Sequence, residues 1–328
     1  MNKLSKAIGT IKKWLKITAA VVVVIFVIVA IVSVAHNHIR KHNQADVTRL
    51  EYNGEIAVEI NDNKPEFSDV ELKKARASYE RYSKLDSLGR CGVAEASIST
   101  DTMPEAGEKR TSLGGVNPSG WQNIKFWVRC HLIGWQLTAE NDNEKNLISG
   151  TNRMNMSGML PYENMVAKYI SENPTNHVLY RVEPVFKDKE LIARGVIMQA
   201  ESVEDKGKGL SFNIFVFNYQ PGSVIDYKTG MAEDNPEYQT VIKIADRTAK
   251  YSGYPIEIEA ATVVGSTGNV KYIYYTDEAA KVKTTEATGS QTPGGPPVYR
   301  GEYYVRAIVS GDEWYSNAAS NVAKLTID

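Results

Sequence analysis

The chain has 328 residues, of which 42% are hydrophobic and 23% charged, so it can form one large domain or two to three ordinary ones and is not disordered over most of its length. Its two cysteines, Cys91 and Cys130, exclude a disulfide framework and a four-thiolate zinc site. A formal net charge of −1 excludes the strong positive field that many nucleic-acid binders carry.

The chain opens with a pattern that is typical of a membrane anchor. Residues 1–16 carry five lysines and no acid, and residues 17–35 (ITAAVVVVIFVIVAIVSVA) are uncharged and apolar. A helix of this length spans roughly 28 Å, close to the thickness of a bilayer core. We therefore expect a cytoplasmic basic segment at 1–16, a transmembrane signal anchor at 17–35 and a juxtamembrane stalk at 36–50, with the remainder outside the cell. The alternative is a cleaved signal peptide and a secreted protein, because residues 33–35 (SVA) resemble a cleavage site.

Residues 51–230 combine predicted strands with helical sequence. Ser68 and Glu71 form a capping-box pattern, which predicts a helix that runs to about Lys84. Irregular and helical sequence at 131–173 separates two groups of predicted strands. This order favours an α+β domain over a parallel, doubly wound sheet. The predicted strands lie at 56–60, 91–97, 123–128, 178–186, 191–200 and 211–218.

Residues 238–328 predict a second, all-β domain with the pattern of a small sandwich. Alternating runs indicate strands at 256–259, 270–274, 303–309 and 322–326, and Gly- and Pro-rich segments connect them. The segments YSGYP, GNVKY, GEYYV and NVAKLTI resemble the MBG-type immunoglobulin-like repeats of Gram-positive surface proteins. The resemblance implies an Ig-like fold, and we expect this domain to be a spacer or accessory domain.

Candidate catalytic groups are scarce in this chain. His177 lies between a polar run and a predicted strand, which favours a loop residue. His131 ends an aromatic run, and the asparagine-rich residues 139–146 follow it. A serine hydrolase is set aside, because the chain has neither a Gly-x-Ser-x-Gly motif nor a spare histidine. The other three histidines lie in the expected stalk: His36, His38 and His42.

The order of the motifs around His131 resembles a known family. Residues 129–132 (RCHL), 143–146 (NEKN) and Asn155 resemble the DNA/RNA non-specific endonucleases, whose site is a ββα-metal finger, and especially the membrane-anchored DNA-entry type of Gram-positive bacteria. The resemblance covers about residues 52–230. It implies a nuclease domain with a central antiparallel sheet and one Mg²⁺ ion as cofactor. The implied activity is hydrolysis of DNA, with RNA as a further candidate substrate, to 5′-phosphate products. Other matching segments are LDSLGRCG, PSGW, GMLPYENM and NYQPG.

The resemblance also implies a role for each residue of the site. His131 matches the general base that takes a proton from the attacking water, a task that suits an imidazole. Asn155 matches the protein ligand of the Mg²⁺ ion. Glu163 matches a glutamate that holds a metal-bound water. Asn146 matches a residue that supports the loop, and Arg129 matches an arginine that is either structural or a phosphate contact.

Two departures from the family pattern are expected to matter. Val128 occupies the usual aspartate position, and Cys130 occupies the usual glycine position. The lost acid motivates an alternative function, a surface binding or adhesion protein whose nuclease site is weak or inactive. A disulfide between Cys91 and Cys130 is left open. Pro161 is favoured at the first position of a helix, which predicts that Glu163 lies near a helix N-terminus.

A nuclease must contact phosphates, and the middle of this chain is nearly neutral. Lys109 and Arg110 are local candidates for such contacts. The resemblance predicts that several of the cationic side chains gather around His131. The nucleic-acid-binding candidates are Lys125, Lys145, Arg153 and Arg181.

Overall fold

The computed structural model describes residues 47–113, 115–124 and 126–328. The expected anchor at 17–35 and nearly all of the expected stalk lie outside these residues. The chain divides into two compact units, Met1–Glu51 and Tyr52–Asp328. Among the described residues, no helix combines the length and the apolar character that crossing a membrane requires.

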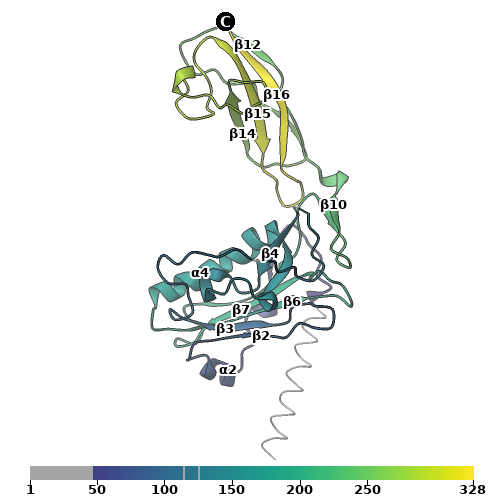
Figure 1. Cartoon of the computed structure of the whole chain (residues 1–328), viewed down its shortest axis with the longest axis vertical. Coiled ribbons are helices and arrows are strands. Elements are labelled where there is room, and N and C mark those ends of the chain that lie inside the picture. Colours follow the sequence, from purple (N-terminus) through teal and green to yellow (C-terminus); the bar gives the residue numbers. More distant parts are fainter. Residues whose placement is uncertain (1–46, 114, 125) are drawn as a thin grey trace, which may run out of the picture. The chain divides into compact units, whose positions relative to one another are not determined.

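A six-stranded antiparallel sheet forms the centre of the α+β part, a name we use for residues 52–222. Its strand order is β1-β8-β7-β6-β3-β2, and the neighbouring strands are antiparallel throughout (Figure 1). The sheet confirms the expected α+β class with a central antiparallel sheet. Its strands are β1 (Ala57–Glu59), β2 (Tyr79–Tyr82), β3 (Ala94–Ile98), β6 (Val178–Val185), β7 (Gly195–Ser202) and β8 (Ser211–Phe217).

Helices cover both faces of this sheet (Figure 1). On one face, α4 (Leu160–Glu172) packs its buried Val166 and Ile170 against the main core, to which β6 contributes Tyr180. On the other face, Leu179 of β6 packs with Ala75, the residue that ends the short helix α2 (Asp69–Lys74). Successive residues of β6 therefore point to opposite sides, as the pleat of a strand requires.

The predicted capping box is confirmed, but the predicted length of its helix is wrong. The amide of Glu71 donates to the Ser68 hydroxyl at 3.3 Å, and the Glu71 carboxylate accepts from the Ser68 amide at 2.9 Å. The helix ends at Lys74 instead of Lys84. Residues 79–82 form an edge strand that pairs with β3, and this long-range pairing outweighs local helical preference.

A β-hairpin and a helix make up the segment that carries most of the predicted site. β4 (Trp127–His131) pairs with β5 (Leu147–Thr151), and the π-helix η3 (Met154–Met159) leads directly into α4. The expected strand at 123–128 is thus shifted, and β5 corrects the expectation that 131–173 is only irregular and helical. All five residues of β5 are buried, so the strand lacks the alternation by which it could be recognised. The connection between the two strands contains α3 (Trp135–Thr138) and η2 (Glu144–Asn146).

The all-β part, residues 239–328, has its own core. A four-stranded sheet of order β12-β16-β15-β14 shares this core with the pair β11-β13, and buried members include Ile242, Val305 and Leu325. The expectation of an all-β domain is confirmed, but 256–259 is not a strand. The strands are β11 (Val241–Lys243), β12 (Arg247–Ala249), β13 (Thr262–Val264), β14 (Val270–Tyr275), β15 (Gly301–Val309) and β16 (Ala318–Ile327).

The two parts are connected by a hairpin, β9 (Ser223–Ile225) with β10 (Ala232–Asp234). The remaining short helices are η1 (Asn61–Asn63), η4 (Pro236–Tyr238) and η5 (Glu286–Thr288). The all-β part carries no described histidine or cysteine, so the candidate chemistry lies in the α+β part.

Candidate active site

His131 is the last residue of β4, and both of its ring nitrogens have a partner. Its Nε2 lies 2.7 Å from the backbone oxygen of Asn141, and its Nδ1 lies 3.1 Å from Nη2 of Arg110. A carbonyl oxygen can only accept and a guanidinium can only donate. The ring is therefore neutral, with its proton on Nε2 and its lone pair on Nδ1.

The surroundings keep His131 uncharged. Burial lowers the pKa of His131 to about 4, and the hydrogen bond to the Asn141 carbonyl opposes this shift. The positive charge of Arg110 lowers the pKa further. A neutral imidazole with an oriented lone pair can accept a proton from water, so the Nδ1 atom has the properties of a general base.

Asn141 organises the loop that faces His131, a role that the sequence alone did not assign. While its backbone oxygen binds the imidazole, its side-chain amide donates to Thr111 and Ser112. Its side-chain oxygen also accepts from Nε of Arg110 at 3.2 Å. One residue thus fixes both the histidine ring and the guanidinium that contacts it. The asparagine-rich run around Asn141 was a signal in the sequence, but ordinary turns are also rich in asparagine, so the run did not identify this role.

Asn146 is fully buried and joins the two ends of the connection between β4 and β5. Its side-chain oxygen accepts from the amide of Ile133 at 2.9 Å, and its side-chain nitrogen donates to the carbonyl of Ile133 at 3.0 Å. The backbone oxygen of Asn146 accepts from the amide of Leu132 at 2.9 Å. These bonds hold the chain immediately after His131, and they fit the supporting role predicted for Asn146.

Asn155 and Cys130 meet at the start of the helix that follows the hairpin. Asn155 lies in η3, and its side-chain oxygen accepts from the Cys130 thiol at 3.2 Å. Cys130 is fully buried and precedes His131 in β4, so this contact links the predicted metal ligand to the strand of the predicted base. A thiol is a weak donor, and it leaves the asparagine oxygen free to bind a stronger partner.

Glu163 is a buried carboxylate on the first turn of α4. Burial raises the pKa of Glu163 to about 7, although hydrogen bonds from the Gly134 amide and the Gln136 side chain, and the charge of Arg110, act in the opposite direction. Gly134 is required here, because a Cβ on it would lie 2.5 Å from Glu163 Oε2. The charge of Arg110 acts on the pKa of Glu163 as well as on that of His131.

Glu163 lies in the first turn of α4, as expected, but this turn is not a free helix N-terminus. Although Pro161 is in the first turn of α4, the preceding residue Met159 already has helical backbone angles and belongs to η3. The amides at the start of α4 are therefore not free to act as a positive helix end. The raised pKa of Glu163 agrees with this arrangement, because a free helix end would favour the charged form.

The residues present fit a single divalent cation. Asn155 offers a neutral oxygen, and Glu163 is a buried carboxylate whose charge no neighbouring cation fully compensates. Oxygen donors of this kind suit Mg²⁺, which retains most of its waters and needs few protein ligands. Within the described residues, no group of three or more His, Cys, Asp or Glu side chains converges as a metal-binding cluster.

Arg129 and Arg181 are both occupied by structural contacts. Arg129 donates to the Val116 carbonyl and the Asn117 side chain, and its guanidinium stacks 4.3 Å from the ring centre of Trp121. These contacts favour the structural alternative for Arg129.

Arg181 is 3% exposed and pairs with Glu95 and Glu71. Its expected role as a nucleic-acid contact is therefore corrected, because its charge is already compensated inside the fold. Of the other candidates, Lys125 lies outside the described residues, Lys145 is half-buried in η2, and Arg153 immediately precedes η3.

Both cysteines are free and buried. The Cys91 thiol donates to the Leu147 carbonyl at 3.1 Å, whereas the Cys130 thiol contacts Asn155. Burial raises the pKa of both thiols, to about 12 for Cys91, so neither has the character of a reactive thiolate. The disulfide that the sequence left open is absent between these two described residues.

Comparison with known proteins finds nuclease relatives for this part of the chain. Residues 69–204 match the family model described as DNA/RNA non-specific endonuclease. A deoxyribonuclease of Streptococcus dysgalactiae subsp. equisimilis is 31% identical over 119 residues, which are 35% of this chain and 35% of that protein. The match thus spans about a third of the length of that relative. Residues 69–204 are therefore similar to the DNA/RNA non-specific endonucleases.

Solved nuclease structures are also similar to this chain. NucA from Streptococcus agalactiae with magnesium bound has a TM-score of 0.47 and 24% identity, over 57% of this chain and 89% of that chain. The Sda1 nuclease with bound zinc has a TM-score of 0.42 and 28% identity, over 48% of this chain and 81% of that chain.

Proposed function

We propose that the protein is a metal-dependent, non-specific endonuclease that hydrolyses phosphodiester bonds in DNA and, as a second substrate, in RNA. The observation that carries this proposal is the state of His131, which is neutral and anchored through Nε2 with its lone pair on Nδ1. That state is the one a general base needs before it takes a proton from water. Glu163 and Asn155 lie in the same segment of the fold and supply oxygen donors for a cation.

Arg110 is proposed to contact His131 in the free enzyme and the substrate phosphate in the complex. Without substrate, its guanidinium donates to Nδ1 of His131 and occupies the lone pair that the base needs. A substrate phosphate is a stronger partner for a guanidinium than a neutral imidazole, because the bond is charge-assisted. The phosphate therefore draws Arg110 away, and Nδ1 becomes available to an attacking water. Asn141 keeps the imidazole oriented while Arg110 moves.

A divalent cation, with Mg²⁺ the ion that best matches the oxygen donors, would be held through Asn155, with a water held by Glu163, and would stabilise negative charge on the leaving oxygen. His131 receives the proton of the water that attacks phosphorus, the bond from phosphorus to the 3′ oxygen breaks, and the released 3′ oxygen takes a proton from solvent water. The products are then a 5′-phosphate and a 3′-hydroxyl. Backbone recognition without base contacts leaves little sequence preference.

The experiment that tests this function uses plasmid DNA and one RNA with Mg²⁺ or with EDTA. We expect cleavage that requires the metal and is lost in His131→Ala. The matched control is His177→Ala, because His177 pairs with Glu204 on the surface and does not contact the site. Cleavage by His131→Ala, or none by the wild-type chain between pH 6 and 9, would contradict the assignment and favour a binding protein with an inactive site.

The location and accessory domain are part of the same proposal. The lysine-rich residues 1–16 and the apolar residues 17–35 support a single-pass anchor with the nuclease outside the cell. The all-β part is proposed to be an Ig-like, MBG-type accessory domain. External protease applied to intact bacteria that express the chain should digest the nuclease domain and spare an N-terminal tag. A protected nuclease domain would contradict the orientation, and release of the nuclease into the medium would favour the cleaved signal peptide.

A further inference from the structure

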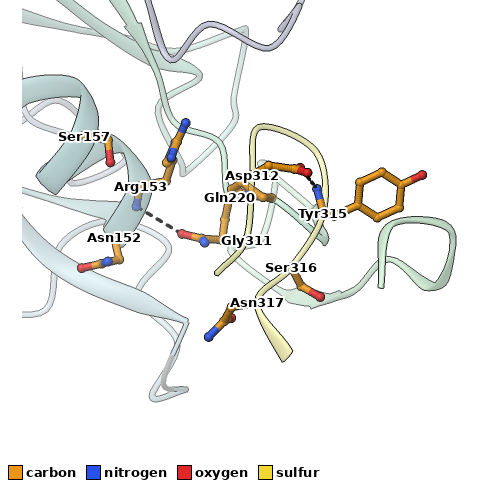
Figure 2. A pocket seen from close by; sticks show the side chains of 10 residues that line it. Asn152, Arg153, Ser157, Gln220, Gly311, Asp312, Tyr315, Ser316 and Asn317 are labelled. Carbon is orange, nitrogen blue, oxygen red and sulfur yellow. Dashed lines mark hydrogen bonds between the residues drawn. The ribbon is translucent and has the colours of Figure 1, made fainter. Parts of the chain in front are cut away.

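A polar pocket lies where the α+β part meets the all-β part (Figure 2). It has a volume of about 290 Å³, and its walls come from two segments of the α+β part and from one loop between β15 and β16. The α+β part contributes Asn152, Arg153, Ser157, Gln220 and Pro221, and the loop contributes Gly311, Asp312, Tyr315, Ser316 and Asn317.

Arg153 gives this pocket a cation with one unsatisfied donor. Its side chain is 27% exposed, its Nη2 makes a loose ion pair with Glu313 at 3.9 Å, and its guanidinium also hydrogen-bonds the Tyr52 hydroxyl. Its Nε is buried and has no hydrogen-bond partner among the described residues. A buried donor without a partner carries a desolvation cost that an added anion can relieve.

The carboxylate of Asp312 adds a negative charge to the wall of the pocket, but its oxygens are bonded within the loop. Its Oδ1 accepts from the amides of Trp314 and Tyr315, and its Oδ2 accepts from the amide of Thr267. Asp312 thus shapes the loop from within, and Figure 2 shows the bond to Tyr315. The same loop presents Asn317, whose exposed side chain lines the pocket and can donate to a phosphate oxygen.

The walls of the pocket are held by aromatic and backbone contacts between the two parts. Tyr52 stacks on Tyr219 at 3.9 Å between ring centres and meets the Trp314 ring edge-on at 5.2 Å. The Trp314 carbonyl accepts from the Gly222 amide at 3.0 Å. These contacts hold the loop that carries Asn317 beside the helix that carries Arg153, so the pocket is a built feature of the fold.

The pocket and the predicted metal ligand lie on one helix, but on different faces of it, because residues two positions apart do not face the same side. Arg153 and Ser157 line the pocket, and Asn155 lies between them in sequence. Four helical residues rise about 6 Å. Phosphates along a strand repeat at about 3.4 Å of axis, so a strand held at Asn155 has another phosphate within reach of the pocket.

We propose that this pocket binds a backbone phosphate next to the scissile bond, so that the all-β part takes part directly in binding the nucleic acid. The proposal rests on the proposed nuclease function. Arg153 supplies the charge, and the side chains of Ser157 and Asn317 supply neutral donors from opposite walls. The ligand class is the phosphodiester backbone of a single strand.

The test measures binding apart from cleavage. A fluorescein-labelled 20-nucleotide single-stranded DNA is titrated with the full chain in EDTA, and Kd is followed by anisotropy at several salt concentrations. Asn317→Asp keeps the side-chain shape and places a negative charge opposite Arg153, and we expect Kd to rise about fivefold. For Arg153→Gln we expect Kd to rise and the slope of log Kd against log salt to fall by about 0.7, the loss of one single-strand phosphate contact.

The matched control is Lys187→Gln, which removes an exposed cation of the α+β part away from the pocket. Its Kd should stay within twofold of the wild-type value, and thermal unfolding should show that all three variants are folded. Unchanged binding by Asn317→Asp overturns the proposal, even if Arg153→Gln binds more weakly, because the all-β part then has no role.

Cleavage of plasmid DNA by the same wild-type preparation separates the two proposals. Metal-dependent cleavage together with unchanged binding by Asn317→Asp leaves the nuclease function standing and removes the pocket. Weakened binding by Asn317→Asp without any cleavage by the wild-type chain supports the pocket and contradicts the nuclease function. No measurable binding by the wild-type chain in EDTA overturns the pocket whatever the activity.

Discussion

Replacing Glu163 with glutamine should make the protein more stable at alkaline pH. The carboxyl group is 8% exposed, and burial raises its pKa from 4.5 to about 7. Between these two values the folded state holds a proton that the unfolded state has lost, so the free energy of unfolding of the wild-type chain falls as pH rises through this window. Glutamine keeps the shape and the oxygen that faces the Gly134 amide, but it has no charge to bury.

The magnitude follows from the pKa of this carboxyl in the folded and in the unfolded chain. Each tenfold difference in proton affinity between the two states corresponds to about 1.36 kcal/mol, so the advantage of Glu163→Gln over the wild-type chain should grow by about 2.5 kcal/mol between pH 5 and pH 8. Other titrating groups, including His131 with its lowered pKa, are shared by both chains and cancel in the difference. Comparing the two curves therefore isolates the contribution of Glu163.

The assay is urea unfolding followed by tryptophan fluorescence at pH 5, 6, 7 and 8 in EDTA. Adding Mg²⁺ at pH 8 should then stabilise the wild-type chain more than Glu163→Gln, since a cation near the carboxylate favours its charged form. Parallel pH curves for the two chains would refute the argument, because Glu163 would then be ionised in the folded state at little cost. An equal response to Mg²⁺ would show that the cation binds away from Glu163.

Three further changes test the geometry of the site. Gly134→Ala should lower kcat tenfold or more, because its Cβ would lie 2.5 Å from Glu163 Oε2 and displace the carboxylate. The control is Gly115→Ala, which has open space around its Cβ and should leave DNA cleavage unchanged. Cys130→Ala removes the thiol that donates to the predicted metal ligand, so it should raise the Mg²⁺ concentration for half-maximal activity about tenfold. Cys130→Ser should restore the wild-type Mg²⁺ requirement. An unaltered metal requirement in Cys130→Ala would show that the thiol has no positioning role. The pH profile of kcat/KM for the wild-type chain, measured with saturating Mg²⁺, should fall on its acid side below pH 6.5. Arg110→Gln should move this fall to higher pH, because the charge of Arg110 lowers the pKa of His131. An unchanged profile in Arg110→Gln would show that Arg110 does not act on the base.

The sequence alone was sufficient to find the residues around which the site is built. His131 is one of two histidines in the folded region, and the resemblance to the DNA/RNA non-specific endonucleases singled it out together with Asn146, Asn155 and Glu163. The capping box of Ser68 and the alternating strands were also predictable. The capping box and the strands depend on residues that are close together in the chain, where local hydrogen bonding and periodicity determine structure.

The tertiary structure decided the electrostatic state of those residues. The pKa of Glu163 is raised by burial next to Gly134. The charge of Arg181 is compensated by Glu95, a residue that lies 86 positions away in the chain. The lone pair of His131 faces Arg110 because Asn141 holds both groups. Burial and ion pairing depend on contacts between distant segments, which composition and spacing do not encode. The sequence therefore indicated which groups form the candidate site, and only the folded chain determined their charge and their partners.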